Sequence, residues 1–192
     1  DNGGFAEANE ARNFRYWYRE GGPLYNAFMP KYAGVNENGE ALYWKDTELN
    51  EANPGTKPGK NLSETTTNYN EATYYEQGSL LPKLYGGFST SFRYKAFDVN
   101  MVFDYQLGGK VFDQAYAELM ANAANGGAAS FGKAIHKDWT KSWSADNLNS
   151  NLPRWQVGDT YQCARSDRFL TSARYLNFQS FSLGYTLPKG LI

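Results

Sequence analysis

The feature that most constrains the fold is a two-residue alternation that runs through residues 87–106. One parity carries mainly large apolar side chains, first over 88–94 and then, after a two-residue turn, over 97–105. These positions hold Phe88, Thr90, Phe92 and Tyr94, followed by Phe97, Val99, Met101, Phe103 and Tyr105. Such alternation over two runs joined by a tight turn predicts an antiparallel β-hairpin that turns at Lys95 and Ala96.

The predicted hairpin fits two kinds of protein. A transmembrane β-barrel strand needs about 9–11 residues, an outward apolar band with aromatic rings near both ends, and an inner face that can be wet. The second parity supplies a mainly polar face with Asp98, Asn100, Val102, Asp104 and Gln106. A half-buried hairpin of a soluble β-sandwich shows the same alternation, so the pattern alone leaves both interpretations open.

The lengths of the connections favour the barrel. We expect about five strands, over residues 11–19, 24–35, the two arms of the hairpin, and 174–187 with a bulge near Gln179 and Ser180. Short turns alternate with two long stretches, 36–84 and 107–173, and the second contains a predicted helix at 114–124. Outer-membrane barrels have short periplasmic turns and long outer loops. The sequence therefore predicts an all-β, antiparallel transmembrane barrel segment over 1–192, with 36–84 and 107–173 as long extracellular loops.

Charge and composition exclude several classes of function. Lys and Arg number 19 against 20 Asp and Glu, so the chain has no basic surface for nucleic acid. A single Cys and a single His leave little from which to build a metal cluster, a disulfide or a Ser-His-Asp triad. We therefore expect no enzyme activity, no cofactor and no metal site.

The apolar content of the chain is unusual. There are 15 Tyr, 12 Phe and 5 Trp, but we count only 5 Val and 2 Ile. A standard branched-aliphatic core cannot be built from this inventory. We expect much of the aromatic content to face lipid near the two membrane interfaces or to lie in the long outer loops.

Individual polar residues offer little chemistry. Asp98 and Asp104 share a predicted strand face but lie six residues apart, which separates them by roughly 20 Å and rules out a cooperating carboxylate pair. We expect them to form hydrogen bonds in the lumen. His136 is expected to cap a turn or lie in a loop, and Cys163 to be an unreactive thiol.

Four aromatic residues crowd the second long stretch and are the candidate binding residues: Trp139, Trp143, Trp155 and Tyr161. Their rings could stack on sugars or pack beneath a partner protein, because Trp and Tyr are enriched at interfaces. The alternative is a small core within the loop, which we favour for any single one of them.

Three blocks of the chain resemble the SusC/RagA-like TonB-dependent outer-membrane transporters of Bacteroidetes. Residues 22–40 (GPLYNAFMPKYAGVNENGE) are similar to the family's G-x-P … Y-x-G-V/L-D-x-x-G segment. Residues 82–110, with PKLYGGF, FRYKAFD and DYQLGGK, resemble its P-x-x-x-G-G-F … Y-K-x-F-D … Y-Q-x-G-G hairpin. Residues 172–188 (SARYLNFQSFSLGYTLP) resemble its S-Y-L-R-L-K-N-I-S-L-G-Y-x-L-P strand, from which Ala173, Asn177 and Phe178 depart.

The resemblance implies a function that the alternation does not. Members of this family form a plugged barrel of about 22 strands in the bacterial outer membrane, and they import glycans or peptides. A SusD-like surface lipoprotein caps the barrel, and TonB supplies energy through the N-terminal region. The resemblance therefore implies four partners: the lipoprotein, TonB, outer-membrane lipid and the rest of the same barrel. We expect this chain to be one segment of such a barrel, because no plug or aromatic-ended closing strand is evident.

Two alternatives remain at this point. One is a soluble or surface-exposed β-sandwich that binds carbohydrate through its loop aromatics. The other is a passive porin or adhesin barrel. The apolar face of the hairpin separates the sandwich from the barrel, because a sandwich must cover that face with a second sheet.

Overall fold

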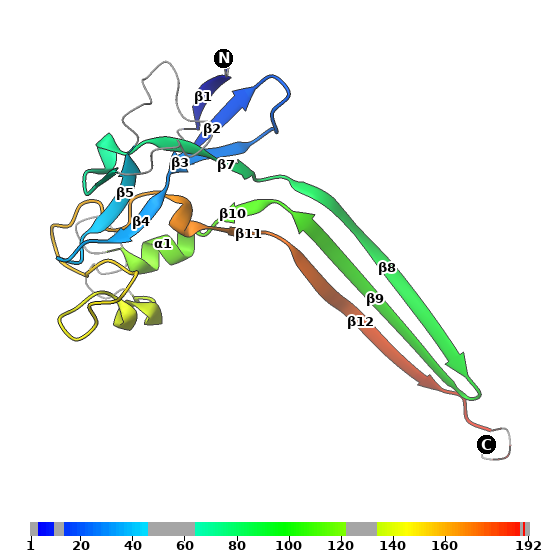
Figure 1. Ribbon diagram of the computed structural model, residues 1–192. Helices are drawn as coiled ribbons and strands as arrows, with labels where there is room; N and C mark the ends of the chain where they lie inside the picture. The colour runs from blue at the N-terminus through cyan, green and yellow to red at the C-terminus, as the bar shows by residue number, and fades with distance from the viewer. Residues whose placement is uncertain (1–3, 10–13, 46–63, 122–133, 189, 191–192) are drawn as a thin grey trace. The chain divides into compact units, whose positions relative to one another are not determined.

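The computed structural model describes residues 4–9, 14–45, 64–121, 134–188 and 190 (Figure 1). The chain divides into two compact units. The first unit comprises Asp1–Ser79 and Val111–Thr171, and the second comprises Leu80–Lys110 and Ser172–Ile192. No helix within the described ranges is long and apolar enough to cross a membrane.

The second unit is a three-stranded antiparallel sheet. Its strands are β8 (Pro82–Tyr94), β9 (Phe97–Gly108) and β12 (Tyr175–Tyr185), in the order β12-β9-β8. They lie side by side along their length (Figure 1). The predicted hairpin and its two-residue turn are confirmed. Lys95 adopts a φ of 54°, the positive value that tight hairpin turns require and that this turn obtains without glycine.

The predicted bulge in the last strand is also confirmed. The pairing of β12 with β9 shifts register between Phe178 and Ser180. The shift brings Phe181 and Leu183 onto the same face as Phe178. Phe178 pairs with Phe103, Phe181 with Met101, and Leu183 with Val99. A single extra residue thus reconciles the two parities of the strand.

Cross-strand register places most of the large apolar side chains of the three strands on one face. The successive rows are Tyr94–Phe97–Tyr185, Phe92–Val99–Leu183, Thr90–Met101–Phe181, Phe88–Phe103–Phe178 and Gly86–Tyr105–Leu176. Apart from the half-buried Gly86, the outer members of these rows are exposed, with Phe92 at 64% and Leu183 at 61%. Among the described residues, no second sheet covers this apolar face.

The opposite face of the same sheet is mainly polar, although it also carries Val102 and, beside Gln106, the rings of Tyr85 and Tyr175. Its rows include Arg93–Asp98–Gly184, Ser91–Asn100–Ser182 and Gly87–Asp104–Asn177. Asp98 and Asp104 lie on this one face, as predicted from their spacing. Gly184 leaves the room that the Asp98 carboxylate occupies, because a Cβ at position 184 would lie 2.5 Å from Asp98 Oδ1.

The other described strands form three small sheets, which are accompanied by short helices. Strands β1 (Gly4–Asn9), β2 (Phe14–Arg19), β3 (Asn26–Pro30) and β7 (Tyr74–Ser79) form one sheet, in that order. Strands β4 (Tyr32–Val35), β5 (Ala41–Lys45) and β6 (Glu64–Thr66) form another, and β10 (Lys110–Phe112) pairs with β11 (Leu170–Ser172). The helices are α1 (Gln114–Met120) and the 3₁₀ turns η2 (Tyr69–Glu71), η4 (Lys137–Lys141) and η5 (Asp167–Phe169).

This architecture refines the expected strands. The segment predicted as one strand over 24–35 forms two strands, β3 and β4. The stretch 36–84 contains β5, β6 and β7, and β7 pairs with β3 rather than standing apart as a loop. The predicted helix begins at Gln114 with Asp113 as its N-cap and ends at Met120, while residues 122–124 lie outside the described ranges. These additional strands are short, which is why the alternation did not reveal them.

The core of the first unit is built largely from aromatic side chains. Trp17 stacks on Phe28 with ring centroids 5.0 Å apart, and Tyr43 and Tyr75 are both only 1% exposed. Aromatic rings thus replace the missing Val and Ile in this core. These rings correct part of the expectation, because they form a core and were expected to face lipid or lie in outer loops. That the rings of the second unit face lipid stays a prediction.

Candidate binding site

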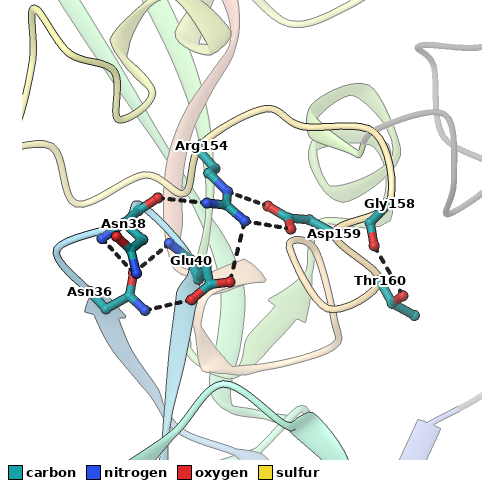
Figure 2. Close-up of polar contacts among 7 residues, drawn as sticks. All are labelled: Asn36, Asn38, Glu40, Arg154, Gly158, Asp159 and Thr160. Carbon is teal, nitrogen blue, oxygen red and sulfur yellow. Dashed lines mark hydrogen bonds and ion pairs between the residues drawn. The ribbon is translucent and has the colours of Figure 1, made fainter.

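The candidate site begins at the tight turn between β4 and β5. Asn36 organises this turn, because its Oδ1 accepts hydrogen bonds from the backbone N–H groups of Asn38 and Glu40, at 3.0 and 2.8 Å. Its Nδ2 donates to Glu40 Oε2 at 2.7 Å (Figure 2). An Asx side chain that hydrogen-bonds its own backbone is a common way to fix such a turn. The turn therefore holds the Glu40 carboxylate in one position.

Gly39 allows a tryptophan to pack directly on this turn. Its φ is +78°, and a Cβ at this position would lie 2.4 Å from a ring carbon of Trp143. Only glycine meets both the backbone and the packing requirement. Trp143 is therefore a packing residue of the turn.

Arg154 joins the turn to a segment that is distant in the sequence. Its guanidinium makes a bidentate contact with Asp159, with Nε to Oδ2 at 2.8 Å and Nη2 to Oδ1 at 3.0 Å. Nη2 also reaches Glu40 Oε1 at 3.3 Å, and Nη1 donates to the Asn38 carbonyl at 3.0 Å (Figure 2). The Asp159 hydrogen bonds raise the pKa of Arg154 above its already high ordinary value. Bidentate pairing fixes the relative orientation of the two groups as well as pairing their charges. Arg154 therefore holds the turn at 36–40 in a fixed position relative to the segment that contains Asp159.

An open pocket of ≈ 260 Å³ lies beside this ion-pair cluster. Three segments line it: Glu40 and Ala41 at the start of β5, Thr67 and Asn68 before η2, and the stretch from Gly158 to Gln162. Most of these residues carry polar groups, and all of them belong to the first unit.

Tyr161 is the one predicted binding residue that lines this pocket. Its ring stacks near Tyr69, with centroids 6.2 Å apart and planes 28° from parallel. Its hydroxyl accepts a hydrogen bond from Asn70 Nδ2 at 2.8 Å. The ring is therefore held in place from two sides.

Three tyrosines donate hydrogen bonds to backbone carbonyls, and one of these carbonyls belongs to Tyr161 of the pocket. Tyr43 donates to the Tyr161 carbonyl at 2.7 Å, Tyr69 to the Arg165 carbonyl at 2.7 Å, and Tyr32 to the Asn151 carbonyl at 2.9 Å. Burial raises the pKa of Tyr32 to about 12 and raises the pKa values of Tyr43 and Tyr69 further, despite the opposing effect of nearby arginines. These hydroxyls are structural donors, not acids at neutral pH.

The other candidate aromatics lie away from the pocket. Trp139 and Trp155 pack edge to face, with centroids 5.4 Å apart and planes at 88°. Their indole nitrogens are buried, which fits the small loop core better than an exposed stacking platform. Trp143 packs on Gly39, as described above. Whether any of the four contacts a ligand remains a prediction.

His136 caps a turn, as predicted, and Cys163 is an unpaired thiol. His136 is the N-cap of η4, and its Nδ1 accepts from the Asp138 N–H at 3.1 Å. Cys163 is a free thiol whose pKa burial raises to about 11. No group of three or more His, Cys, Asp or Glu able to hold a metal ion occurs in the part of the chain that the structure describes.

Sequence reasoning missed Glu40, Arg154 and Asp159. The turn residues 36–40 were noticed only as part of a family block, and nothing in the sequence links them to Arg154, which lies 114 residues beyond Glu40. Their joint role becomes visible only in three dimensions.

Comparison with known proteins supports the recognised resemblance. No family model matches the chain. The chain is 27% identical over 176 residues to TonB-dependent receptor P3 of Formosa agariphila, a match that covers 91% of this chain but 16% of the relative. The chain thus spans about one sixth of that relative's length.

A solved structure shows the same fold. The structure described as that of the RagAB peptide transporter matches with a TM-score of 0.63 and 21% identity, and the match covers 86% of this chain and 17% of the other. At this identity the likeness concerns the fold alone. It confirms the predicted fold class, an antiparallel β segment like that of a TonB-dependent transporter.

Proposed function

Because the chain resembles SusC/RagA-like TonB-dependent transporters over most of its length, we propose that it forms part of the barrel of an outer-membrane nutrient importer. In this proposal the chain acts in transport and carries out no catalysis. The cargo is a glycan or a peptide, and a SusD-like lipoprotein and TonB are the partners of the complete transporter.

The exposed apolar face of β8, β9 and β12 carries this proposal. Nine of its side chains are 50% or more exposed: Phe88, Phe92, Tyr94, Phe97, Leu176, Phe178, Phe181, Leu183 and Tyr185. Exposed apolar patches of this extent on a protein in water mark an interaction site. Strands of 13, 12 and 11 residues are long enough to cross a bilayer, which needs about 9–11.

The two faces match the two environments of a barrel wall. Aromatic rows such as Tyr94–Phe97–Tyr185 suit the interface with lipid headgroups, and the opposite polar face suits a wet lumen. The β-sandwich alternative needs a second sheet on the apolar face, and the exposure of that face disfavours it.

The proposal makes the parts of the first unit that lie within the two predicted loops part of the extracellular surface, while residues 11–19 and 24–35 stay predicted barrel strands. The two predicted loops, 36–84 and 107–173, contribute β5, β6, β7 and α1 to this unit. A SusD-like lid would rest on such a surface, and cargo would reach the barrel past it.

Membrane fractionation combined with protease treatment tests the proposed function. The complete gene product is expected in the outer-membrane fraction of a density gradient. Protease added to intact cells should cut within 107–173 and leave the hairpin 82–108 uncut. Recovery in the soluble or inner-membrane fraction, or cleavage of the hairpin in intact cells, would contradict the proposal.

Affinity purification in mild detergent tests the partner. The tagged gene product should retain a lipid-modified protein that incorporates labelled palmitate. Its absence from the purified material, with the barrel itself intact, would argue for a passive porin or adhesin instead.

A further inference from the structure

The size of the pocket beside Arg154 limits what it can hold. Sites for drug-sized ligands measure about 300–1,000 Å³. At ≈ 260 Å³ this pocket suits a single ring and not an extended chain. A longer molecule could place only one of its units there.

The charges of the pocket are already balanced by internal contacts. Both oxygens of Asp159 accept hydrogen bonds from Arg154. Glu40 accepts one from Arg154 through Oε1 and one from Asn36 through Oε2. A cationic ligand would have to compete with these bonds, and an anion would meet two carboxylates against one guanidinium. The site therefore favours a neutral ligand.

The remaining polar groups of the pocket suit hydroxyl groups. Thr67 and Thr160 are exposed at its wall, and their hydroxyls can both donate and accept. The Thr160 hydroxyl makes only a long contact of 3.4 Å to the Gly158 carbonyl (Figure 2). A bound hydroxyl can replace that contact with a shorter one.

Tyr161 also lines the pocket, and its ring can offer an apolar surface beside these polar groups. Tyr69 and Asn70 hold it in place before any ligand arrives. A ligand with one apolar face and a polar edge would use both the ring and the threonines. A sugar ring has this combination, with C–H groups on its faces and hydroxyls at its rim.

We propose that the pocket formed by Glu40, Asn68 and residues 158–162 binds one neutral sugar unit. The Tyr161 ring lies against a face of the sugar, and the hydroxyls of Thr67 and Thr160 bond to its rim. This inference rests on the proposed function, because it identifies the cargo chemistry that the outer surface of an importer would meet. It selects glycan over peptide between the two cargo classes.

The Arg154 contacts make the site preorganised. They fix the turn at Glu40 to the segment at Asp159 before a ligand binds. Binding therefore costs little conformational entropy, because these segments are already ordered. Arg154 is a positioning residue here and does not touch the sugar.

Direct binding to the complete transporter in detergent tests the proposal. The probes are glucose, galactose and mannose, each compared with its uronate and its 2-amino analogue, together with trialanine. Saturation-transfer NMR should detect at least one neutral sugar, bound about 10-fold or more tightly than its charged analogues and than trialanine.

A pair of matched variants assigns the binding to this pocket. Thr160→Val should weaken binding of the neutral sugar roughly 3- to 10-fold, the effect of one lost hydrogen bond. Thr140→Val is the control, because Thr140 is also exposed but bonds to the Lys137 carbonyl and does not line the pocket. It should leave binding unchanged.

Three results would overturn the proposal: no neutral sugar binds, a charged analogue or trialanine binds more tightly, or both variants behave alike. Binding in detergent does not depend on transport. Failure of the proposed function would appear instead as mislocalisation of a protein that still binds sugar.

Discussion

The ring of Phe103 stacks on the ring of Phe88 across the β8–β9 hairpin, with centroids 4.8 Å apart and planes 14° from parallel. On its other side Phe103 meets Phe178 of β12, with centroids 4.9 Å apart. This row crosses all three strands on the exposed face. Cross-strand aromatic pairs stabilise a sheet by roughly 0.2–1 kcal/mol each, but they do not hide these rings from the surroundings. In the proposed barrel, this row of rings would face lipid.

Substituting Arg for Met101 tests that environment. Met101 lies in the middle row of the apolar face, between Thr90 and Phe181. If this row is near the bilayer midplane, a lipid-facing Arg there should destabilise the barrel by about 2–4 kcal/mol. The measurement is the unfolding free energy of the complete protein in lipid vesicles.

Asn100→Arg is the matched control, because Asn100 neighbours Met101 but lies on the polar face. It should destabilise the barrel by less than Met101→Arg. Equal effects of the two substitutions would show that the faces are assigned incorrectly.

Replacing Gly39 with Ala tests the turn beside the pocket. The added Cβ combines an unfavourable positive φ with a clash against Trp143, so we expect a loss of about 2–4 kcal/mol. Gly21→Ala is the comparison, since Gly21 has a φ of +67° with nothing within 4 Å of the added carbon, and it should cost about 1 kcal/mol. Thermal unfolding of both variants measures the two losses of stability. Similar losses would show that the contact between Trp143 and the turn does not restrict position 39.

Arg154→Lys tests the bridge between Glu40 and Asp159. Lys keeps the charge but cannot reproduce the bidentate contact, so the variant should lose about 1.5–3 kcal/mol and expose the 154–159 segment to protease. Arg174→Lys changes an exposed arginine of β12's flank and should be neutral. Unchanged protease resistance of Arg154→Lys would contradict the bridging role.

The thiol of Cys163 should react slowly in the folded protein. Burial raises its pKa from the ordinary value to about 11, so at pH 8 the reactive thiolate is about 100-fold rarer than in the unfolded chain. Alkylation by iodoacetamide at pH 8 should therefore be far faster in urea than in buffer. Rates within a factor of three of each other would show that Cys163 is accessible and ionised.

High pH should weaken the first unit. The pKa of Tyr32 is raised to about 12 in the folded state, so the unfolded state loses its proton first as the pH rises above 10. Stability is therefore complete below pH 10 and falls between pH 10 and about 12. Melting temperature should decline over this window, and it should decline less in Tyr32→Phe, which has no phenol at this position. Equal declines in the two proteins would show that Tyr32 does not contribute to the loss.

The long hairpin and the bulge of the last strand could be predicted from the sequence, because apolar and polar side chains alternate along these strands and so indicate which face each residue lies on. Phe88, Phe103 and Phe178 fall on one side by parity alone, once the shift near Ser180 is allowed. The strand β7 could not be found in this way, since Tyr74–Ser79 does not alternate and gains its place from pairing with β3. Short strands depend on their neighbours more than on their own pattern.

The pocket could be predicted only in part. Tyr161 stood out because aromatic residues crowd its stretch of sequence, but Trp139 and Trp155 stood out for the same reason and pack on each other instead. Glu40 and Asp159 drew no attention, because a charged residue in a polar stretch is ordinary. Their importance comes from Arg154, which the fold brings to them.

The most direct test of the account is a scan of solvent exposure along β9 in the complete protein within a lipid bilayer. Single nitroxide labels are placed at each position from 97 to 106 in a Cys163→Ser background, and their relaxation by oxygen and by a water-soluble nickel complex is measured. The account predicts strict alternation, with oxygen favoured at 97, 99, 101, 103 and 105 and nickel favoured at the positions between them. Uniform access to the nickel complex along the strand, or alternation with the opposite parity, would contradict the claim that this face meets lipid.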